Sequence, residues 1–322
     1  MSAQKLLNVK YLKMYYLTRD GRWVRAVDNV SFDLNKSEGL GIVGESGSGK
    51  SSLAHTIMRI LPYNARILDG KILLDGVNIL DLDEKRFRRE VRWKKISLIP
   101  QGAMNSLNPV YKISEQIIET IMTHDNIDKN EARARAEKLF EYVGLDPSLI
   151  DRYPHEFSGG MKQRVMIAMA LACNPEIVIA DEPTTALDVI VQAQILKLIR
   201  GLKDRFNMAI ILITHDLSIV PQLCGKLAIM YAGRILEYGS IRDLFKNPLH
   251  PYTKGLMNAI PDIRMRKEMK SIPGNPPNLL DLPTGCRFHP RCPYFKEGLC
   301  NKIDPELVEV DKEHYVACHL YS

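Results

Sequence analysis

The sequence has 322 residues, of which 45% are hydrophobic and 25% are charged. This composition is that of an ordinary folded protein and excludes a collagen-like or intrinsically disordered chain, and the length allows one or two domains. The formal net charge is +6, but Lys and Arg are dispersed along the chain, whereas a nucleic-acid-binding protein usually gathers them in one stripe. We therefore expect no nucleic-acid partner.

The predicted elements, taken in chain order, begin with strand-like alternation over residues 5–43 that ends in a short buried strand at 39–43. A glycine-rich loop follows, and residues 51–61 then have the apolar spacing of a helix. The pattern predicts further buried strands at 96–99, 177–180 and 209–213, and helices at 113–145, 161–173 and 189–203. Strands that alternate with helices predict an α/β fold with a parallel sheet covered on both faces.

The composition changes after residue 245. Prolines are dense in residues 248–305, which predicts loop-rich chain and no further sheet. We therefore predict a large domain over residues 1–245 and a small irregular C-terminal domain over residues 246–322.

The apolar runs are short throughout the sequence. The longest, residues 165–173, is about half of the ~20 residues that a membrane-spanning helix needs. Residues 1–5 contain no apolar stretch of the kind found in signal peptides. These patterns predict a cytoplasmic protein without a transmembrane segment.

A phosphate-binding motif follows the first buried strand. Residues 44–51 match G-x-x-x-x-G-K-[ST], in which glycines turn backbone N–H groups toward a phosphate and the following helix points its positive end at the same anion. Lys50 adds positive charge between the outer phosphates, and the Ser51 hydroxyl reaches Mg²⁺. A surface glycine turn is the alternative, but the flanking strand and helix favour a nucleotide site. The predicted ATP-binding residues of the loop are Gly44, Glu45, Ser46, Gly47, Ser48, Gly49, Lys50, Ser51 and Ser52.

Two carboxylates follow the buried strand at 177–180. Asp181, at the carboxyl end of this strand, can hold the magnesium shell, and Glu182 is placed to polarise the attacking water. Two acidic residues after a strand also occur as helix caps, and alone that would be the better interpretation. In a chain that carries a phosphate loop, the pair instead predicts a catalytic role.

Further motifs complete a set that is specific to one family. Ser158-Gly159-Gly160 opens a helix as a second anion-binding turn, whereas Gln101 and His215 each follow a buried strand. The set, in chain order, is the phosphate loop, Gln101, Ser158-Gly159-Gly160, Asp181-Glu182, Ala186-Leu187-Asp188 and His215. It resembles the ATP-binding cassette (ABC) family of transport ATPases over roughly residues 5–245. The resemblance implies a phosphate-loop parallel sheet core with an antiparallel β region and a helical subdomain at about 102–170.

The resemblance also implies how the residues act. Two cassettes would dimerise head to tail, so that each ATP is held by one phosphate loop and by the other cassette's signature. The signature residues acting in trans would be Ser158, Gly159, Gly160, Met161 and Gln163. Glu182 would be the general base and His215 the γ-phosphate sensor. Asp188 would line the dimer seam, and Gln101 would join Ser51 and Asp181 around Mg²⁺.

An aromatic residue near the N-terminus would stack on the adenine of ATP in this family. Tyr16 is the first candidate and Trp23 the second, although either ring can equally serve plain packing.

Three tail segments, residues 247–253, 272–277 and 286–293, resemble the C-terminal extension of dipeptide and oligopeptide importer ATPases. Nickel and oligosaccharide importers share this extension, so the solute stays open. The resemblance implies a Mg²⁺-dependent ATPase peripheral to the cytoplasmic face of the cell membrane. Its partners would be a second ABC ATPase subunit in a heterodimer, two transmembrane permeases and, indirectly, an extracytoplasmic solute-binding protein.

Other functional classes fit the sequence less well. A cassette ATPase acting on DNA or ribosomes generally carries two cassettes or a long coiled-coil insertion. A small-molecule kinase has no use for the Ser158-Gly159-Gly160 signature. A non-catalytic regulator would not need Lys50, Asp181, Glu182 and His215 together.

Four of the six cysteines, Cys286, Cys292, Cys300 and Cys318, lie in the tail, whereas Cys173 and Cys224 sit in apolar surroundings typical of buried thiols. The cytoplasm disfavours disulfides, and the spacing fits neither zinc pairs nor ferredoxin runs, which leaves a metal site and unpaired thiols open.

Two physical points favour a metal site in the tail. The tail is short and poor in aliphatic residues, so it needs a cross-link to hold its shape. Arg287, Arg291 and Lys296 flank the thiols and would favour their ionised form. Because similar peptide-importer ATPases can hold a [4Fe-4S] cluster, we predict a structural [4Fe-4S] cluster on the four tail cysteines, with zinc as the alternative.

Overall fold

The computed structural model describes residues 5–102, 105–259 and 272–321. These residues form two compact units, each assembled from distant parts of the sequence. The first unit comprises the described residues of Asn35–Glu38 and Ile79–Leu212. The second unit comprises the described residues of Lys5–Leu34, Gly39–Asn78 and Ile213–Ser322. The domain boundary near residue 246 stays a prediction.

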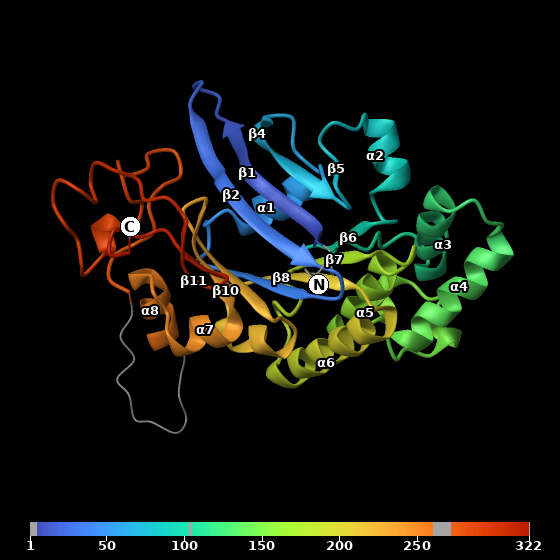
Figure 1. The fold of residues 1–322 in the computed structure, drawn as a ribbon. Helices are drawn as coiled ribbons and strands as arrows, with labels where there is room; N and C mark the ends of the chain where they lie inside the picture. Colours follow the sequence, from blue (N-terminus) through green and yellow to red (C-terminus); the bar gives the residue numbers. More distant parts are fainter. Residues whose placement is uncertain (1–4, 103–104, 260–271, 322) are drawn as a thin grey trace. The chain divides into compact units, whose positions relative to one another are not determined.

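The second unit contains a four-stranded sheet, drawn in blue and cyan in Figure 1. Its strand order is β2-β1-β4-β5, with β1 at Lys5–Leu17, β2 at Trp23–Asn35, β4 at Ala65–Leu74 and β5 at Val77–Asn78. β1 pairs antiparallel with β4, and β4 pairs antiparallel with β5. Leu7 and Val9 of β1 are buried, because every second side chain of a strand points to the same face. After the register shift between Lys10 and Lys13, the buried alternation continues one position out of step at Leu12 and Met14.

The second unit also contains the strand that precedes the phosphate loop. This strand, β3 (Gly39–Val43), is buried throughout and pairs in parallel with β9 (Lys226–Tyr231), which pairs antiparallel with β10 (Arg234–Ser240). The tail adds β12 (His314–Val316) against β10, and β11 (Val308–Asp311) against β12. The prediction that the tail adds no sheet is therefore wrong. These strands have three and four residues, too few to show a recognisable alternation in the sequence.

The helices of the second unit are short. They are α1 (Lys50–Ile57), α7 (Ile241–Lys246) and α8 (Pro251–Asn258), together with 3-10 helices at Leu217–Gln222 and His289–Arg291. α8 begins on a proline, whose fixed φ suits the first position of a helix.

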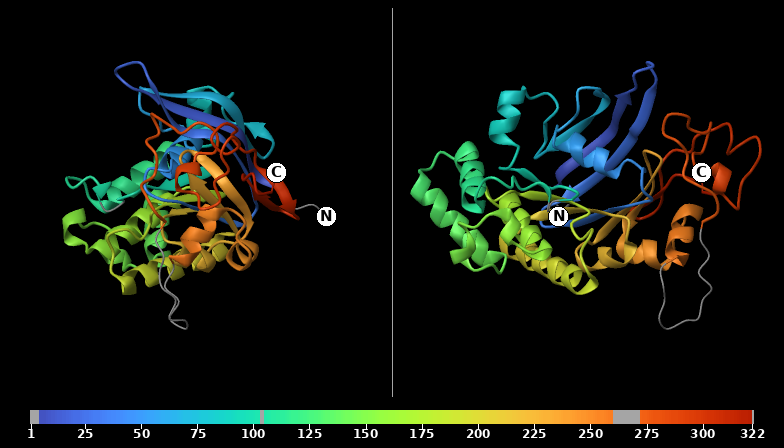
Figure 2. Two further views of the ribbon diagram at one scale, coloured as in Figure 1. Left: turned by 90° about the vertical axis from the view of Figure 1, so that its left-hand side faces the viewer. Right: turned by 180° about the vertical axis from the view of Figure 1, so that it is seen from behind.

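The first unit is mainly helical around a parallel pair of strands, β6 (Ile96–Ile99) and β7 (Ile177–Asp181). Its helices are α2 (Glu84–Glu90), α3 (Ile113–His124), α4 (Lys129–Tyr142), α5 (Gly159–Ala170) and α6 (Val189–Phe206), with 3-10 turns at Pro147–Leu149 and Pro154–Glu156. Helices α3 to α6 lie side by side in succession (Figures 1 and 2). Strand β8 (Ala209–Thr214) belongs to the first unit up to Leu212 and to the second beyond it.

The single helix predicted over residues 113–145 is two helices, α3 and α4. The chain turns at Asp125, and Asp128 then caps α4 by accepting hydrogen bonds from the N–H groups of Asn130 and Glu131 at 2.7 and 2.9 Å. Aspartate is among the preferred N-cap residues, so a new helix starts where the apolar pattern alone suggested continuity.

Within the described ranges, no helix is both long and apolar enough to cross a bilayer.

Candidate nucleotide-binding site

The phosphate loop connects β3 to α1 in the second unit. Its last glycine, Gly49, has φ of +100°, and a Cβ atom there would lie 2.0 Å from the carbonyl oxygen of Ala26. This backbone conformation and this close approach both require glycine. The loop therefore enters α1 along a path that no other residue type could follow without shifting β2.

Lys50 is the first residue of α1, and its side chain folds back over the loop. The residue is only 6% exposed, and its Nζ donates to the carbonyl oxygens of Gly44 and Glu45 at 2.8 and 2.9 Å. Nζ also lies 3.3 Å from Ser48 Oγ. Gly49 has no side chain, so no side-chain hydrogen bond caps the first turn of α1. The N–H groups of this turn, and with them the positive end of the helix dipole, face the loop. The loop thus has the geometry of an anion-binding cradle.

Tyr16 is held against the phosphate-loop helix. Its hydroxyl donates to Ser52 Oγ in α1 at 3.0 Å. Trp23, by contrast, packs against Tyr15 with ring centroids 6.4 Å apart. Of the two candidate aromatic residues, the structure therefore joins Tyr16 to the predicted ATP-binding residues.

The predicted catalytic carboxylates lie at the end of β7 in the first unit. Asp181 is buried and Glu182 is half-buried. Glu182 Oε2 accepts hydrogen bonds from Gln101 Nε2 at 3.1 Å and from Thr185 Oγ1 at 3.0 Å. Glu182 has φ of +47°, a sparsely populated backbone region for a non-glycine residue. The structure thus brings Gln101 and Glu182 together, although they are distant in the sequence.

The signature motif forms the start of α5. Ser158 is exposed and caps the helix, with its Oγ accepting from the N–H of Met161 at 3.4 Å. Gly160 allows a close approach to α6, because a Cβ atom there would lie 2.9 Å from Val191 Cγ1. Gly159 and Met161 are half-buried, whereas Gln163 is buried. An exposed serine beside two glycines at a helix N-terminus leaves backbone N–H groups accessible.

Asp188 has a local structural role at the start of α6. Its Oδ1 accepts from the N–H of Val191 at 2.9 Å, which is the geometry of an N-cap. The next two residues, Val189 and Ile190, are 80% and 72% exposed. The start of α6 therefore presents two adjacent apolar side chains to solvent.

His215 follows β8 in the second unit and is exposed. The backbone there is fixed locally, because the N–H of Asp216 donates to Thr214 Oγ1 at 3.0 Å and Asp216 caps the next 3-10 turn. The imidazole is thereby presented at the surface of its unit.

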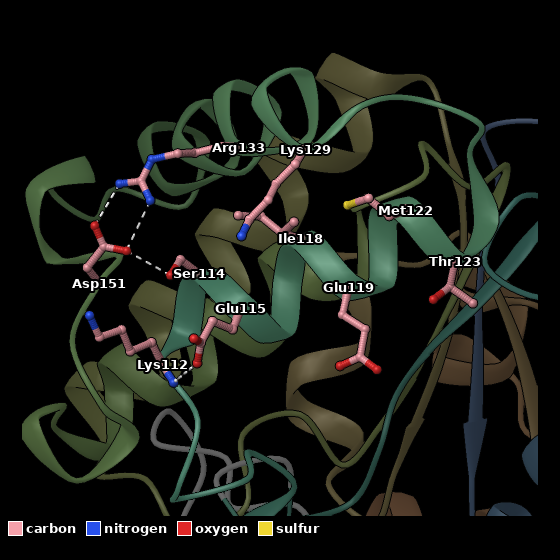
Figure 3. Close-up of a pocket in the computed structure, with 10 residues that line it drawn as sticks. All are labelled: Lys112, Ser114, Glu115, Ile118, Glu119, Met122, Thr123, Lys129, Arg133 and Asp151. Atoms are coloured by element: carbon pink, nitrogen blue, oxygen red, sulfur yellow. Dashed lines mark hydrogen bonds and ion pairs between the residues drawn. The ribbon is translucent and has the colours of Figure 1, made fainter.

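A groove of about 570 Å³ lies between α3 and α4 of the first unit (Figure 3). Its wall includes the apolar residues Ile118 and Met122. At one end Asp151 accepts hydrogen bonds from Arg133 at 2.7 Å and from Ser114 at 2.8 Å, which lower the pKa of Asp151 to about 2. This anchored carboxylate fixes the rim of the groove at neutral pH.

The prediction of a [4Fe-4S] cluster on Cys286, Cys292, Cys300 and Cys318 is wrong. Across residues 5–102, 105–259 and 272–321, no group of three or more His, Cys, Asp or Glu side chains is arranged to hold a metal ion. This finding also leaves the zinc alternative without a ligand set.

The reason lies in the surroundings of the thiols. Burial raises the pKa of Cys286 to about 12, and burial likewise raises the pKa of Cys292 and of Cys318. The two arginines expected to ionise the thiols pair elsewhere, Arg287 with Asp28 and Arg291 with Glu45. The tail is instead linked to the rest of the second unit by these ion pairs and by the pairing of β12 with β10.

The fold and the phosphate loop define a cassette-type nucleotide-binding protein, and comparison with known proteins places it more closely. Residues 27–185 match the ABC transporter family, and residues 236–300 match the oligopeptide/dipeptide transporter C-terminal region. The structure resembles a bacterial ABC transporter cassette solved as a dimer, with a TM-score of 0.65 and 26% identity over 73% of this chain and 99% of that one. A post-hydrolysis state of a cassette bound to ADP and Pi matches with a TM-score of 0.64 and 27% identity over the same shares.

The curated relatives agree over nearly the whole chain. The oligopeptide transport ATP-binding protein OppD of Escherichia coli (strain K12) is 51% identical over 94% of this chain and 90% of that protein. The dipeptide transport ATP-binding protein DppD of Caldanaerobacter subterraneus subsp. tengcongensis is 43% identical over 98% of this chain and 97% of that protein. The chain belongs to the ABC transporter family, as a transport ATPase with the oligopeptide/dipeptide-type C-terminal region. The predictions of the fold class, the family and the ATPase activity are confirmed.

Proposed function

We propose that this chain hydrolyses ATP to drive an importer of oligopeptides, dipeptides or a related solute such as an oligosaccharide or nickel. The observation that carries the proposal is the phosphate loop closed over Lys50 in a chain whose residues 236–300 match the oligopeptide/dipeptide transporter C-terminal region. The relatives named above are peptide transport ATP-binding proteins, which supports a peptide as the first choice of solute.

We propose the domain division of this ATPase from its sequence. The nucleotide-binding domain spans residues 1–245, with a helical subdomain at about 102–170, and the C-terminal extension spans residues 246–322. Residues 1–4, 103–104, 260–271 and 322 lie outside the described residues.

ATP binds through residues 44–52 of the phosphate loop and through Tyr16. The Lys50 ammonium, which donates to neutral carbonyl oxygens of the loop, would donate more strongly to charged phosphate oxygens. Tyr16 would stack on the adenine, and the hydrogen bond of its hydroxyl to Ser52, which places the residue beside the loop, supports this role. Ser51, Gln101 and Asp181 offer hydroxyl, amide and carboxylate oxygens, the donors that Mg²⁺ prefers, and bound Mg²⁺ would neutralise phosphate charge.

Glu182 acts as the general base for the attacking water. The hydrogen bonds from Gln101 and Thr185 both end on Oε2, so they orient the carboxylate that would take the water proton. His215 contacts the γ-phosphate, which its exposed position after β8 supports.

Two cassettes pair during the cycle, and the partner is a second, related ABC ATPase subunit. The exposed Ser158 with its glycines, and the exposed Val189 and Ile190 beside Asp188, are the surfaces that support this proposal. The signature would bind the ATP held by the partner's phosphate loop.

Replacing Ser158 by Arg tests this assembly. The bulky cation should block the site completed in trans, so the ATPase activity of the complex falls by at least about half, whereas ATP binding to the chain's own loop is unchanged. Phosphate release by the complex and fluorescent ATP-analogue titration of the isolated chain measure the two effects. Ser148→Arg, an exposed serine of the same unit, is the matched control. Equal activity of the two variants would contradict the role in trans, and recovery of homodimers alone would contradict the heterodimer.

The chain works at the cytoplasmic face of the membrane, bound to two permease subunits and indirectly dependent on a solute-binding protein. The groove between α3 and α4 is the proposed docking place for a cytoplasmic segment of a permease (Figure 3). It lies in the helical subdomain, and it combines apolar Ile118 and Met122 with charged Lys112 and Glu119 on its walls. An apolar centre with a polar rim is the usual anatomy of a protein interface.

Met122→Glu should reduce co-purification of the permeases by about tenfold, because a charge would be buried in the apolar part of the groove. The measurement is capture of the tagged chain from detergent-solubilised native membranes, followed by quantification of the membrane-spanning proteins. Leu68→Glu, at 49% exposure against 44% for Met122, is the control in the other unit. Undiminished permease recovery with Met122→Glu would exclude this groove as the docking site.

A further inference from the structure

Residues of the C-terminal tail form hydrogen bonds and an ion pair with the phosphate loop, and both segments belong to the second unit. Arg291, at the end of the 3-10 helix His289–Arg291, forms a two-pronged ion pair with Glu45, the second residue of the loop. The distances are 2.7 Å to Oε2 and 3.0 Å to Oε1. The Arg291 Nε donates to the carbonyl oxygen of Pro273 at 2.8 Å, which fixes the plane of the guanidinium. A bidentate pair of this kind restrains orientation as well as distance.

The tail side also holds the backbone of Glu45. The N–H of Glu45 donates to the hydroxyl of Tyr252 at 3.0 Å, and Tyr252 lies fully buried in α8. The ring of Tyr252 packs against those of Tyr231 and Phe288, with centroids 4.6 and 5.4 Å away. Glu45 is therefore held at its side chain by one tail residue and at its backbone by another, both on a rigid aromatic support.

A second tail arginine steadies the other end of the loop. Arg287 donates to the carboxylate of Asp28 and to the carbonyl oxygen of Ala232. The neighbouring Gly233 donates its N–H to the carbonyl oxygen of Ser48 in the loop at 2.8 Å. Contacts linked to the tail thus reach both residue 45 and residue 48, which bracket the glycine turn of the cradle.

The shape of this cradle depends on those anchors. The Glu45 carbonyl oxygen that accepts from Lys50 belongs to the residue that Arg291 and Tyr252 hold. If Glu45 turned, that carbonyl would move and the Lys50 ammonium would lose its seat in the loop. A misplacement of a binding group by about 1 Å is costly even when the group itself is intact.

We propose that Arg291 is a positioning residue of the ATP site, which acts through Glu45 to hold the phosphate loop in its anion-binding shape. The inference rests on ATP binding at the loop and adds a role for the C-terminal region in nucleotide affinity. Arg291 does not itself contact the nucleotide. It fixes the shape of the loop that binds the nucleotide.

The test is titration of the purified full-length chain with a fluorescent ATP analogue, alongside ATPase kinetics. Arg291→Ala should weaken analogue binding by about tenfold, within the range usual for coupled sites. The KM for ATP should rise with little change in kcat, because no catalytic group has been removed. Arg291→Lys, which keeps the charge but loses the two-pronged geometry, should lie between the wild type and Arg291→Ala.

Glu45→Gln carries the same test from the partner residue and retains the size of the side chain. It should weaken binding as much as Arg291→Ala, and the double variant should be no worse than either single variant, since both break one pair. If Arg291→Ala fails to fold, as seen by circular dichroism, the Glu45→Gln result alone decides the proposal.

The control is Asp304→Asn, which removes a different link between the tail and a core strand, the 2.8 Å ion pair with Arg234. Asp304→Asn should leave analogue binding within about twofold of the wild type. Binding weakened equally by Asp304→Asn and Glu45→Gln would show that any loosening of the tail suffices, and would overturn the positioning role. Unchanged binding in Glu45→Gln would overturn it as well.

Lys50→Ala separates this proposal from the proposed function. If Lys50→Ala abolishes analogue binding while Arg291→Ala and Glu45→Gln do not weaken it, only the positioning role fails. If the wild-type chain binds no analogue, or if Lys50→Ala binds it normally, the ATP site itself has been misassigned.

Discussion

Replacement of Glu182 by Gln lowers the ATP turnover of this protein by about 10²-fold or more and leaves ATP binding intact. The amide keeps the size of the carboxylate and can still meet Gln101 and Thr185 at its oxygen, but it cannot accept a proton from the attacking water. The expected signature is a fall in kcat without a rise in the dissociation constant of ATP. Phosphate release under saturating ATP and titration with a fluorescent analogue measure the two quantities.

Two further variants serve as comparisons for Glu182→Gln. Lys50→Ala should instead weaken ATP binding, because it removes the ammonium from the loop. Glu176→Gln, also in the first unit, replaces a carboxylate that pairs with Lys95 just before β7 and should leave turnover unchanged. A Glu182→Gln protein with wild-type turnover would show that another group is the base.

Local chemistry made much of the nucleotide site predictable. The glycine positions, Lys50 and the helix after them follow from one short motif, because the backbone path of the loop admits little else. The buried strands β6, β7 and β8 were likewise predictable, since each is a short apolar run with a polar group at its end.

The parts that escaped prediction depend on contacts between distant residues. The pair of Glu45 and Arg291 joins positions 246 residues apart, and nothing in either sequence neighbourhood indicates it. The charges beside the tail cysteines pointed to ionised thiols, but Arg287 and Arg291 turn to carboxylates of the core. A basic residue that is close to a cysteine in the sequence can therefore form its ion pair with a different residue in the fold.

The break between α3 and α4, by contrast, had a local signal in the sequence. The apolar pattern of residues 113–145 predicts one helix, whereas the capping geometry of Asp128 starts a second one. Asp128 precedes a glutamate at the third helical position, Glu131, which is a recognisable start signal. That signal was present in the sequence and outweighed by the periodicity.

The ion pair of Arg287 and Asp28 predicts the largest effect on stability. The two side chains are 4% and 7% exposed, and Asp28 also accepts a hydrogen bond from Tyr15 at 2.8 Å. Burial alone would raise the pKa of Asp28, but the charge and hydrogen bonds of Arg287 outweigh it, so the pKa is held below its ordinary value. Arg287→Ala leaves a buried carboxylate without its cation, which typically costs about 3–5 kcal/mol of the free energy of unfolding.

The pH dependence of this loss follows from the same carboxylate. In the wild type the depressed pKa contributes stability above the unfolded pKa of about 3.9, and this contribution is lost as the pH falls through the lower folded value. In Arg287→Ala burial instead raises the folded pKa, so protonation on acidification relieves the variant. The difference in unfolding free energy between the two proteins should therefore be largest near pH 7 and shrink below about pH 5.

Urea unfolding at pH 7 and at pH 4.5, followed by circular dichroism, measures this difference in unfolding free energy. Arg22→Ala, which breaks two solvent-exposed ion pairs, with Asp20 and Asp281, should cost no more than about 1 kcal/mol at either pH. If Arg287→Ala were no more costly than Arg22→Ala, or if its cost grew on acidification, the buried ion pair would not be the anchor of the tail.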